Sequence, residues 1–104
     1  MIYVTEQAAL QIRTAAVAGG VEGLALRLAA RQLPDGSIDY GMGFDNQQPD
    51  DLETKAYGVT IVVAPPFKSV LNNLSLDYVE IAPGDFRFIF QNPNDTAHGA
   101  PTKR

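Results

Sequence analysis

The stretch LALRLAAR, residues 24–31, decides how the chain is expected to fold. Four apolar side chains of this stretch would share one face of an extended chain: Leu24, Leu26, Leu28 and Ala30. Arg27 and Arg31 would lie on the opposite face. An apolar period of two residues is typical of a strand that buries one face. We therefore expect a strand here, followed by a turn at LPDGS, residues 33–37.

Further strands are predicted on either side of the middle of the chain. IDYGMGF, residues 38–44, alternates in the same way, and VTIVV, residues 59–63, is rich in β-branched residues. LDYVEI, residues 76–81, and FRFIFQ, residues 86–91, flank the sequence APGD, which is typical of a turn. These segments together predict several short strands.

Two helices are predicted as well. Thr5 can cap the first helix, and Gly19 and Gly20 can end it. Its apolar stripe is made by Ala8, Ala9, Ile12, Ala15 and Ala16. A second, short helix is predicted after Pro65 and Pro66, with one apolar face made by Phe67, Val70, Leu71 and Leu74. Short strands and two helices predict an α+β fold, built around a small curved sheet or sandwich.

Composition and charge narrow the classes of function. The chain has 104 residues, 45% of them hydrophobic, so we expect one domain with its own core. The formal charge of −4 argues against a nucleic-acid partner, because phosphate binding needs clustered Lys and Arg. The start of the chain has no basic and apolar leader, and no apolar run approaches the roughly 18 residues of a spanning helix. We therefore expect a cytoplasmic protein without a membrane partner.

Five motifs occur in an order and spacing that identify a family. They are L-R-L-x-x-R at Leu26–Arg31, Tyr40 with Phe44, GVTIVV at residues 58–63, LDYV at residues 76–79 and F-x-N-P-N at residues 90–94. In these motifs the chain resembles the HesB/IscA family of A-type iron–sulfur carriers over nearly its whole length. The resemblance implies a HesB/IscA-like domain over residues 1–94. Residues 95–104, which have almost no apolar side chain, are predicted to be a flexible C-terminal tail.

The cluster ligands of that family are missing from this chain. Family members carry one cysteine in a G-C-S-G turn and two in a C-G-C motif after N-P-N, and these hold the cluster or iron. The corresponding positions here are Asp35, Gly99 and Pro101, and the chain has no cysteine. Because thiolates hold iron–sulfur clusters, we expect no cluster and no other cofactor. The chain resembles the cysteine-free variants associated with dissimilatory sulfite reductase genes.

Asp35 and His98 are the candidate metal ligands, with Asp95 or Asp45 near one of them in the sequence. Carboxylate and imidazole groups suit a hard iron or another divalent ion. Asp35 lies in P-D-G, where turn formation also explains an acidic residue, and His98 lies in the predicted tail. We therefore predict no metal site, and keep a weak ion site at Asp35 and His98 as the alternative.

Other polar and aromatic groups are predicted to be structural. Asp50, Asp51 and Glu53 lie in DNQQPDDLETK, residues 45–55, which is predicted to be a polar, solvated loop or a docking surface. Catalysis is not expected, because the sequence has neither a G-x-S-x-G elbow nor a Gly-rich phosphate loop. Tyr40 and three aromatic residues on one strand face, Phe86, Phe88 and Phe90, are predicted to be packing residues of the core.

These observations predict a carrier-like scaffold that no longer carries a cluster and that is not an enzyme. It would act as an adapter or regulator for a protein partner, either the iron–sulfur assembly machinery or a client protein of sulfur metabolism. Two alternatives are a weak iron or divalent-metal binding protein that uses Asp35 and His98, and an unrelated small-ligand binding module. The sequence leaves open the identity of the partner, the surface that binds it and the oligomeric state.

We predict that anaerobic incubation with ferrous iron and sulfide leaves no visible chromophore on the protein after desalting. The physical reason is that no thiolate is present to give sulfur-to-iron charge transfer. Absorption spectra and assays of bound iron and sulfide measure the outcome. A stable brown protein with stoichiometric iron and sulfide would contradict the prediction.

Overall fold

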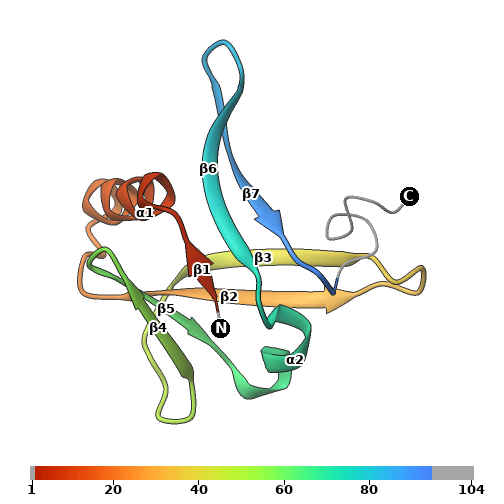
Figure 1. Ribbon diagram of the computed structural model, residues 1–104. Helices are drawn as coiled ribbons and strands as arrows, with labels where there is room; N and C mark the ends of the chain where they lie inside the picture. Colours follow the sequence, from red (N-terminus) through yellow and green to blue (C-terminus); the bar gives the residue numbers. More distant parts are fainter. Residues whose placement is uncertain (1, 95–104) are drawn as a thin grey trace.

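The computed structural model describes residues 2–94, which form two β-sheets and two helices (Figure 1). The strands are β1 (Tyr3–Val4), β2 (Ala25–Gln32), β3 (Ile38–Asp45), β4 (Leu52–Ala56), β5 (Val59–Val63), β6 (Ser75–Ala82) and β7 (Asp85–Gln91). The helices are α1 (Glu6–Gly19) and α2 (Lys68–Leu71), and a 3₁₀ turn, Pro65–Phe67, precedes α2. The predicted α+β class is confirmed. No helix in this part of the chain is long and apolar enough to cross a membrane.

The larger sheet has four strands in the order β3-β2-β5-β4. β2 pairs with β3 in antiparallel fashion along its whole length, and it pairs in parallel with β5, where Leu26 lies opposite Ile61. A two-residue turn joins β4 to β5, with φ of 51° at Tyr57 and 81° at Gly58. Two positive φ angles are typical of a type I′ turn, whose twist matches that of the strands it joins.

The prediction of a polar loop at residues 45–55 is wrong for residues 52–55, because Leu52–Ala56 forms β4. β4 pairs only with β5 within the described residues, and is therefore an edge strand there. An edge strand does not need a regular apolar face, and both Glu53 and Lys55 are exposed on it. The period of two residues therefore could not reveal this strand.

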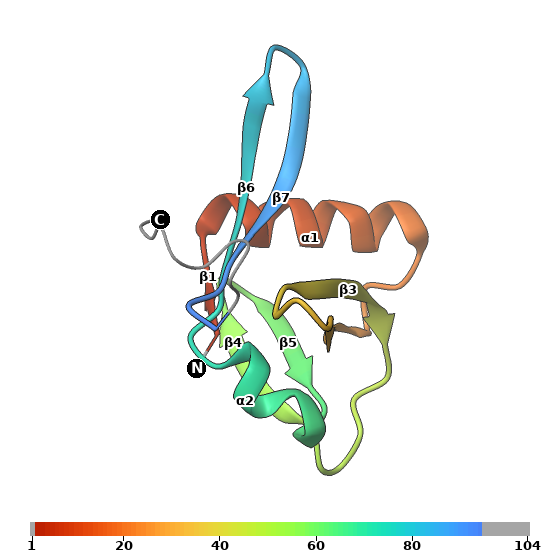
Figure 2. The ribbon, with the colours of Figure 1, turned by 90° about the vertical axis from the view of Figure 1, so that its right-hand side faces the viewer.

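The smaller sheet has three strands in the order β1-β6-β7. β1 runs parallel to β6 and pairs with it at two positions, Tyr3 opposite Ser75 and Val4 opposite Leu76. Two residues are too few to show a periodic pattern, so the sequence did not predict β1. β6 and β7 form a long antiparallel hairpin that projects away from the larger sheet (Figures 1 and 2).

Helix α1 begins and ends at the residues that the sequence predicts. The Thr5 hydroxyl accepts a hydrogen bond from the backbone N–H of Ala8 at 3.1 Å and donates one to Oδ1 of Asp77 at 2.7 Å. Gly20 ends the helix with φ of 70°, a left-handed conformation that glycine adopts at little cost. Because Asp77 belongs to β6, the cap also ties the start of α1 to the hairpin.

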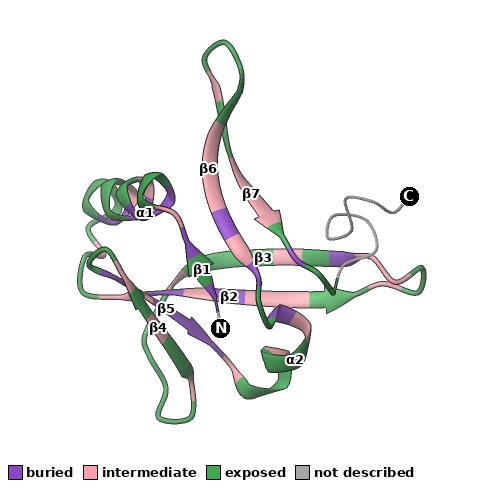
Figure 3. Ribbon diagram, viewed as in Figure 1, coloured by how far each residue is buried: buried purple, intermediate pink, exposed green. Residues whose placement is uncertain are grey.

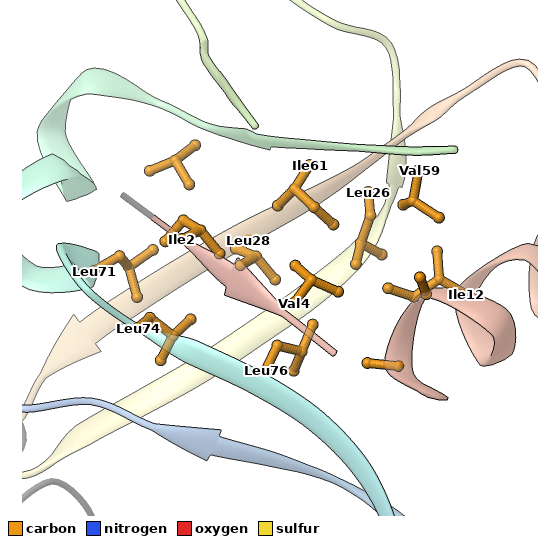
Figure 4. Packing of buried hydrophobic residues seen from close by; sticks show 13 residues of the cluster. Ile2, Val4, Ile12, Leu26, Leu28, Val59, Ile61, Leu71, Leu74 and Leu76 are labelled. Carbon is orange, nitrogen blue, oxygen red and sulfur yellow. The ribbon is translucent and has the colours of Figure 1, made fainter. Parts of the chain in front are cut away.

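Both sheets and both helices contribute to one hydrophobic core (Figure 3). Its buried members are Ile2, Val4, Ala8, Ala9, Ile12, Leu26, Leu28, Val59, Ile61, Val63, Leu71, Leu74 and Leu76. Figure 4 shows Leu26, Leu28 and Ile61 of the larger sheet with Val4 and Leu76 of the smaller sheet beside them. The alternation of residues 24–31 is therefore the pattern of a strand that faces this core.

The aromatic row of β7 is only partly a packing feature. Phe88 and Phe90 pack against the core, as predicted. The prediction is wrong for Phe86, which is 52% exposed. Phe86 is the second residue of β7, close to the turn of the hairpin, and its ring stacks on that of Tyr78 with centroids 5.8 Å apart.

We predict that Leu76→Ala lowers the free energy of unfolding by about 2–5 kcal/mol, because it removes buried methyl groups and leaves a cavity. Leu76 is fully buried between the sheets. Leu10→Ala is the matched control, since Leu10 is 56% exposed on α1 and its loss should change stability by about 0.5 kcal/mol or less. Urea unfolding curves measure both, and equal effects would contradict this account of the core.

Candidate functional site at the turn between β2 and β3

The turn between β2 and β3 holds Asp35, the position of the first missing cysteine. The backbone N–H of Leu33 donates to the carbonyl oxygen of Ser37 at 2.8 Å, and the N–H of Gly36 donates to that of Leu33 at 2.9 Å. Gly36 has φ of 89°, which a residue with a side chain rarely adopts. The turn is therefore closed by its own backbone, and its shape does not depend on a bound metal or cluster.

The Asp35 carboxylate is used by the turn itself. Its Oδ1 accepts hydrogen bonds from the Ser37 hydroxyl at 2.6 Å and from the Ser37 backbone N–H at 3.0 Å. These two bonds hold the pKa of Asp35 below its usual value. Asp35 is thus an exposed, ionised group with one oxygen already satisfied, as the turn interpretation of P-D-G predicts.

The nearest charged pair on the same hairpin does not supply further ligands. Arg31 donates to Oδ2 of Asp39 at 3.0 Å, and both side chains are exposed. Asp45, the other proposed neighbour, lies at the opposite end of β3 from the turn. Among residues 2–94 there is no group of three or more His, Cys, Asp or Glu side chains placed to hold a metal ion. The structure therefore leaves Asp35 as a single carboxylate.

The other proposed site residues lie outside the described residues. They are His98 and Asp95, together with Gly99 and Pro101 at the two remaining cysteine positions. The predicted flexible tail at residues 95–104 lies outside them too. The structure thus neither brings Asp35 and His98 together nor separates them, and both the metal alternative and the prediction of no metal site stay predictions.

The N-P-N motif holds the end of β7 against α2. Asn92 is fully buried, and its Nδ2 donates to the carbonyl oxygen of Val70 at 2.8 Å. Its Oδ1 accepts from the backbone N–H of Asn94 at 2.9 Å. The Nδ2 of Asn94 donates to the carbonyl oxygen of Asn72 at 3.0 Å. The motif therefore satisfies backbone carbonyl groups at the end of α2, and it sets where the chain leaves the domain.

Tyr40 connects the β2–β3 hairpin to this exit. Its ring stacks on that of Phe90, with centroids 4.6 Å apart and planes 4° from parallel. The stack joins β3, which begins just after the Asp35 turn, to β7, which ends just before N-P-N. The packing role predicted for Tyr40 is confirmed, because Tyr40 packs against the core. The sequence did not reveal its stacking partner Phe90 or the contact of Asn92 with α2, because each of these contacts joins distant segments.

Arg27 of the L-R-L-x-x-R motif has a structural role on the other face of β2. Its Nη1 and Nη2 donate to the two carboxylate oxygens of Asp51 at 2.9 and 2.7 Å. Its Nε donates to Oδ2 of Asp45 at 2.8 Å, and Nη2 also donates to the carbonyl oxygen of Asn46 at 3.0 Å. One guanidinium group thereby holds both ends of the loop at residues 45–51.

The predicted solvation of Asp51 is wrong, because its side chain is only 1% exposed. The Arg27 guanidinium, together with the backbone N–H of Gln48, holds the pKa of Asp51 below its usual value. A carboxylate with a lowered pKa stabilises the fold above its unfolded pKa, and that contribution is lost as the pH falls through the folded pKa. Asp51 therefore contributes to the fold at neutral pH and is not available as an ion ligand.

No protein-family model matches the chain, but known proteins are similar to it over most of its length. A protein of the nifU 5′ region of Cereibacter sphaeroides is 32% identical over 95 residues, which cover 90% of this chain and 89% of that protein. SufA of Bacillus subtilis (strain 168) is 28% identical over 97 residues, which cover 92% of this chain and 80% of that protein.

Solved structures show the same fold. The crystal structure of IscA with the [2Fe-2S] cluster has a TM-score of 0.75 at 28% identity, covering 92% of this chain and 88% of that one. Escherichia coli SufA, involved in biosynthesis of iron–sulfur clusters, has a TM-score of 0.74 at 21% identity, covering 95% of this chain and 86% of that one. The two layers of short strands described above are therefore the shared architecture.

We predict that the double substitution Asp35→Ala, His98→Ala leaves the melting temperature nearly unchanged and that ferrous or manganous ion shifts it in neither protein. An ion that binds only the folded state would raise the melting temperature by mass action. Asp35→Asn is the control for the turn, because it keeps an oxygen for the Ser37 bonds and removes the charge. A metal-dependent rise in the parent that the double variant loses would establish the alternative ion site.

Proposed function

We propose that this chain acts as a protein-binding scaffold that carries no cluster. The chain belongs to the HesB/IscA family of A-type iron–sulfur carriers, and yet it has no cysteine. One observation carries the proposal. The chain superimposes on IscA with its [2Fe-2S] cluster over 92% of its length, while its own sequence contains no thiolate. A fold that is retained without the cluster ligands is better explained by contacts with other proteins than by metal transfer.

The local geometry supports this proposal. Asp35, at the first cysteine position, makes two hydrogen bonds within its own turn, so the turn forms without a metal. Asn92 and Tyr40 hold the frame through contacts that involve no ligand. These contacts hold the described part of the chain without a ligand, and we expect the protein to work without a cluster.

The partner that we propose is a component of iron–sulfur assembly or a client protein. The likeness to IscA, whose solved structure contains a [2Fe-2S] cluster, supports the first choice. We further propose a sulfur-metabolism setting in the cytoplasm, since the chain resembles DsrR, the cysteine-free variant associated with dissimilatory sulfite reductase genes of sulfur-oxidising bacteria. In this role the protein would regulate or connect other proteins and would catalyse no reaction.

Introducing cysteines at the three ligand positions of the family tests whether the fold can still hold a cluster. We predict that the triple substitution Asp35→Cys, Gly99→Cys, Pro101→Cys gains a visible chromophore after anaerobic incubation with ferrous iron and sulfide. Thiolates would then stand at the family's three ligand positions. The matched control places Ser at the same three positions, which changes the same sites without adding a thiolate.

Absorption spectra with iron and sulfide assays separate the two triple variants. A chromophore in the Cys variant and none in the Ser variant supports a retained frame. A folded Cys variant that stays colourless would overturn it. Circular dichroism of both variants reports folding, so that a colourless result has one interpretation.

Affinity capture tests the adapter role itself. The parent and the Cys variant are immobilised and exposed to anaerobic extract of the native cells. The proposal expects both to capture the same iron–sulfur assembly or client proteins, since the scaffold and not a cluster makes the contacts. Capture by the cluster-loaded Cys variant alone would show that binding needs the cluster, and would contradict the adapter role.

A further inference from the structure

β7 presents an open strand edge. Within residues 2–94 it pairs with β6 on one side and has no strand on the other. Such an edge carries a row of backbone N–H and C=O groups that can pair with another strand. Figures 1 and 2 show that the β6–β7 hairpin extends well beyond the larger sheet. The edge is therefore approachable along the projecting part of the hairpin.

The long edge strands of the described domain, β3, β4 and β7, differ in the residues that they carry. β4 has the charged residues Glu53 and Lys55, and β3 is interrupted by Gly41 and Gly43. Charged residues, glycines and prolines discourage pairing at an edge. β7 reads DFRFIFQ, with neither glycine nor proline over seven residues, and its two charged residues, Asp85 and Arg87, pair with each other. Its three phenylalanines and its isoleucine are residue types that are enriched in strands.

The side chains along this edge are suited to a second strand. Phe86 is 52% exposed, and its ring stacks on that of Tyr78. Nearer the body, Tyr40, Phe88, Ile89 and Phe90 line a hollow of about 180 Å³. A strand laid along β7 would cover Phe86 and could place one apolar side chain in this hollow. Such side-chain pockets give specificity when a peptide adds to a sheet edge.

The charges on the opposite face of β7 set the polarity of the partner. Asp85 and Arg87 lie two residues apart, so they share the face opposite the aromatic row. They contact each other at 3.3 Å, and their side chains are 43% and 64% exposed. Opposite charges on neighbouring strands attract, and like charges repel. A complementary strand therefore carries an acidic residue opposite Arg87 and a basic residue opposite Asp85.

We propose that β7 binds an extended segment of a protein partner, which adds to the sheet as an antiparallel strand. The segment has apolar residues at alternate positions, one of them in the Tyr40 hollow, and an acidic and a basic residue opposite Arg87 and Asp85. Main-chain hydrogen bonds supply affinity, and the hollow and the charges supply selectivity. This inference rests on the proposed function only in that the partner is a protein.

A designed peptide tests the edge directly. Opposite β7 in antiparallel register, the sequence Thr-Leu-Thr-Val-Glu-Val-Lys places Glu by Arg87, Lys by Asp85 and Leu by Phe90. The peptide, blocked at both ends, is titrated to about 2 mM into ¹⁵N-labelled protein, a range suited to a weak complex. We expect amide shifts along β7 and at Tyr40, and none at Leu10 and Val17 on the exposed face of α1.

Charge exchange supplies the matched control. The peptide Thr-Leu-Thr-Val-Lys-Val-Glu should bind the parent about fivefold more weakly, because both cross-strand pairs become repulsive. The double variant Asp85→Lys, Arg87→Glu should reverse that preference. Both substituted side chains are at least 43% exposed, so the fold should be retained, and unshifted core amides verify this.

Three outcomes overturn the proposal. These are absence of shifts along β7, shifts elsewhere on the domain, and equal binding of the two peptides by the parent protein. Sedimentation of the protein alone provides a fourth, since a dimer abolished by Arg87→Glu would show that a second copy occupies this edge. None of these results depends on iron, sulfide or an assembly protein, so the proposed function and this inference can fail separately.

Discussion

The packing of the central β2–β5 pair against β1 and β6 is the interaction on which the other parts of the domain depend. Leu28 of β2, Ile61 of β5 and Leu76 of β6 are at most 1% exposed. Burial of such side chains contributes about 1.5–3 kcal/mol each. The faces of α1 and α2 close the same core. The turn that holds Asp35 joins two strands of the larger sheet, β2 and β3.

Asp35, which counting along the motifs places at the first cysteine position of the family, is exposed and lies outside the core, so the fold does not need a thiolate there. Asp35 stands in a turn closed by backbone hydrogen bonds. Arg27 fastens the loop at residues 45–51 on the opposite face through the buried Asp51 carboxylate. Removal of one partner of such a pair would leave the other with an uncompensated charge. The arginine of the L-R-L-x-x-R motif is thus explained by its structural contacts.

The sequence predicted those elements that are specified by residues close together in the chain. β2 and β3 show an apolar period of two residues. The cap of α1 is also local, because the Thr5 hydroxyl accepts a hydrogen bond from the backbone N–H of Ala8, three residues later. β4 was missed because an edge strand needs no apolar face. The burial of Asp51 could not be predicted, because its partner Arg27 is 24 residues away in the sequence. For the same reason the sequence predicted that Tyr40 packs but not its partner Phe90, and it identified the N-P-N motif without its contacts.

The central claim is that this protein works as a cluster-free scaffold. The most direct test is the metal and sulfide content of the protein isolated anaerobically from its native cells. The account predicts neither iron nor acid-labile sulfide in amounts related to the protein, with no visible absorption band, since the chain has no thiolate. Iron and sulfide in a fixed ratio to the chain, released together on denaturation, would contradict it.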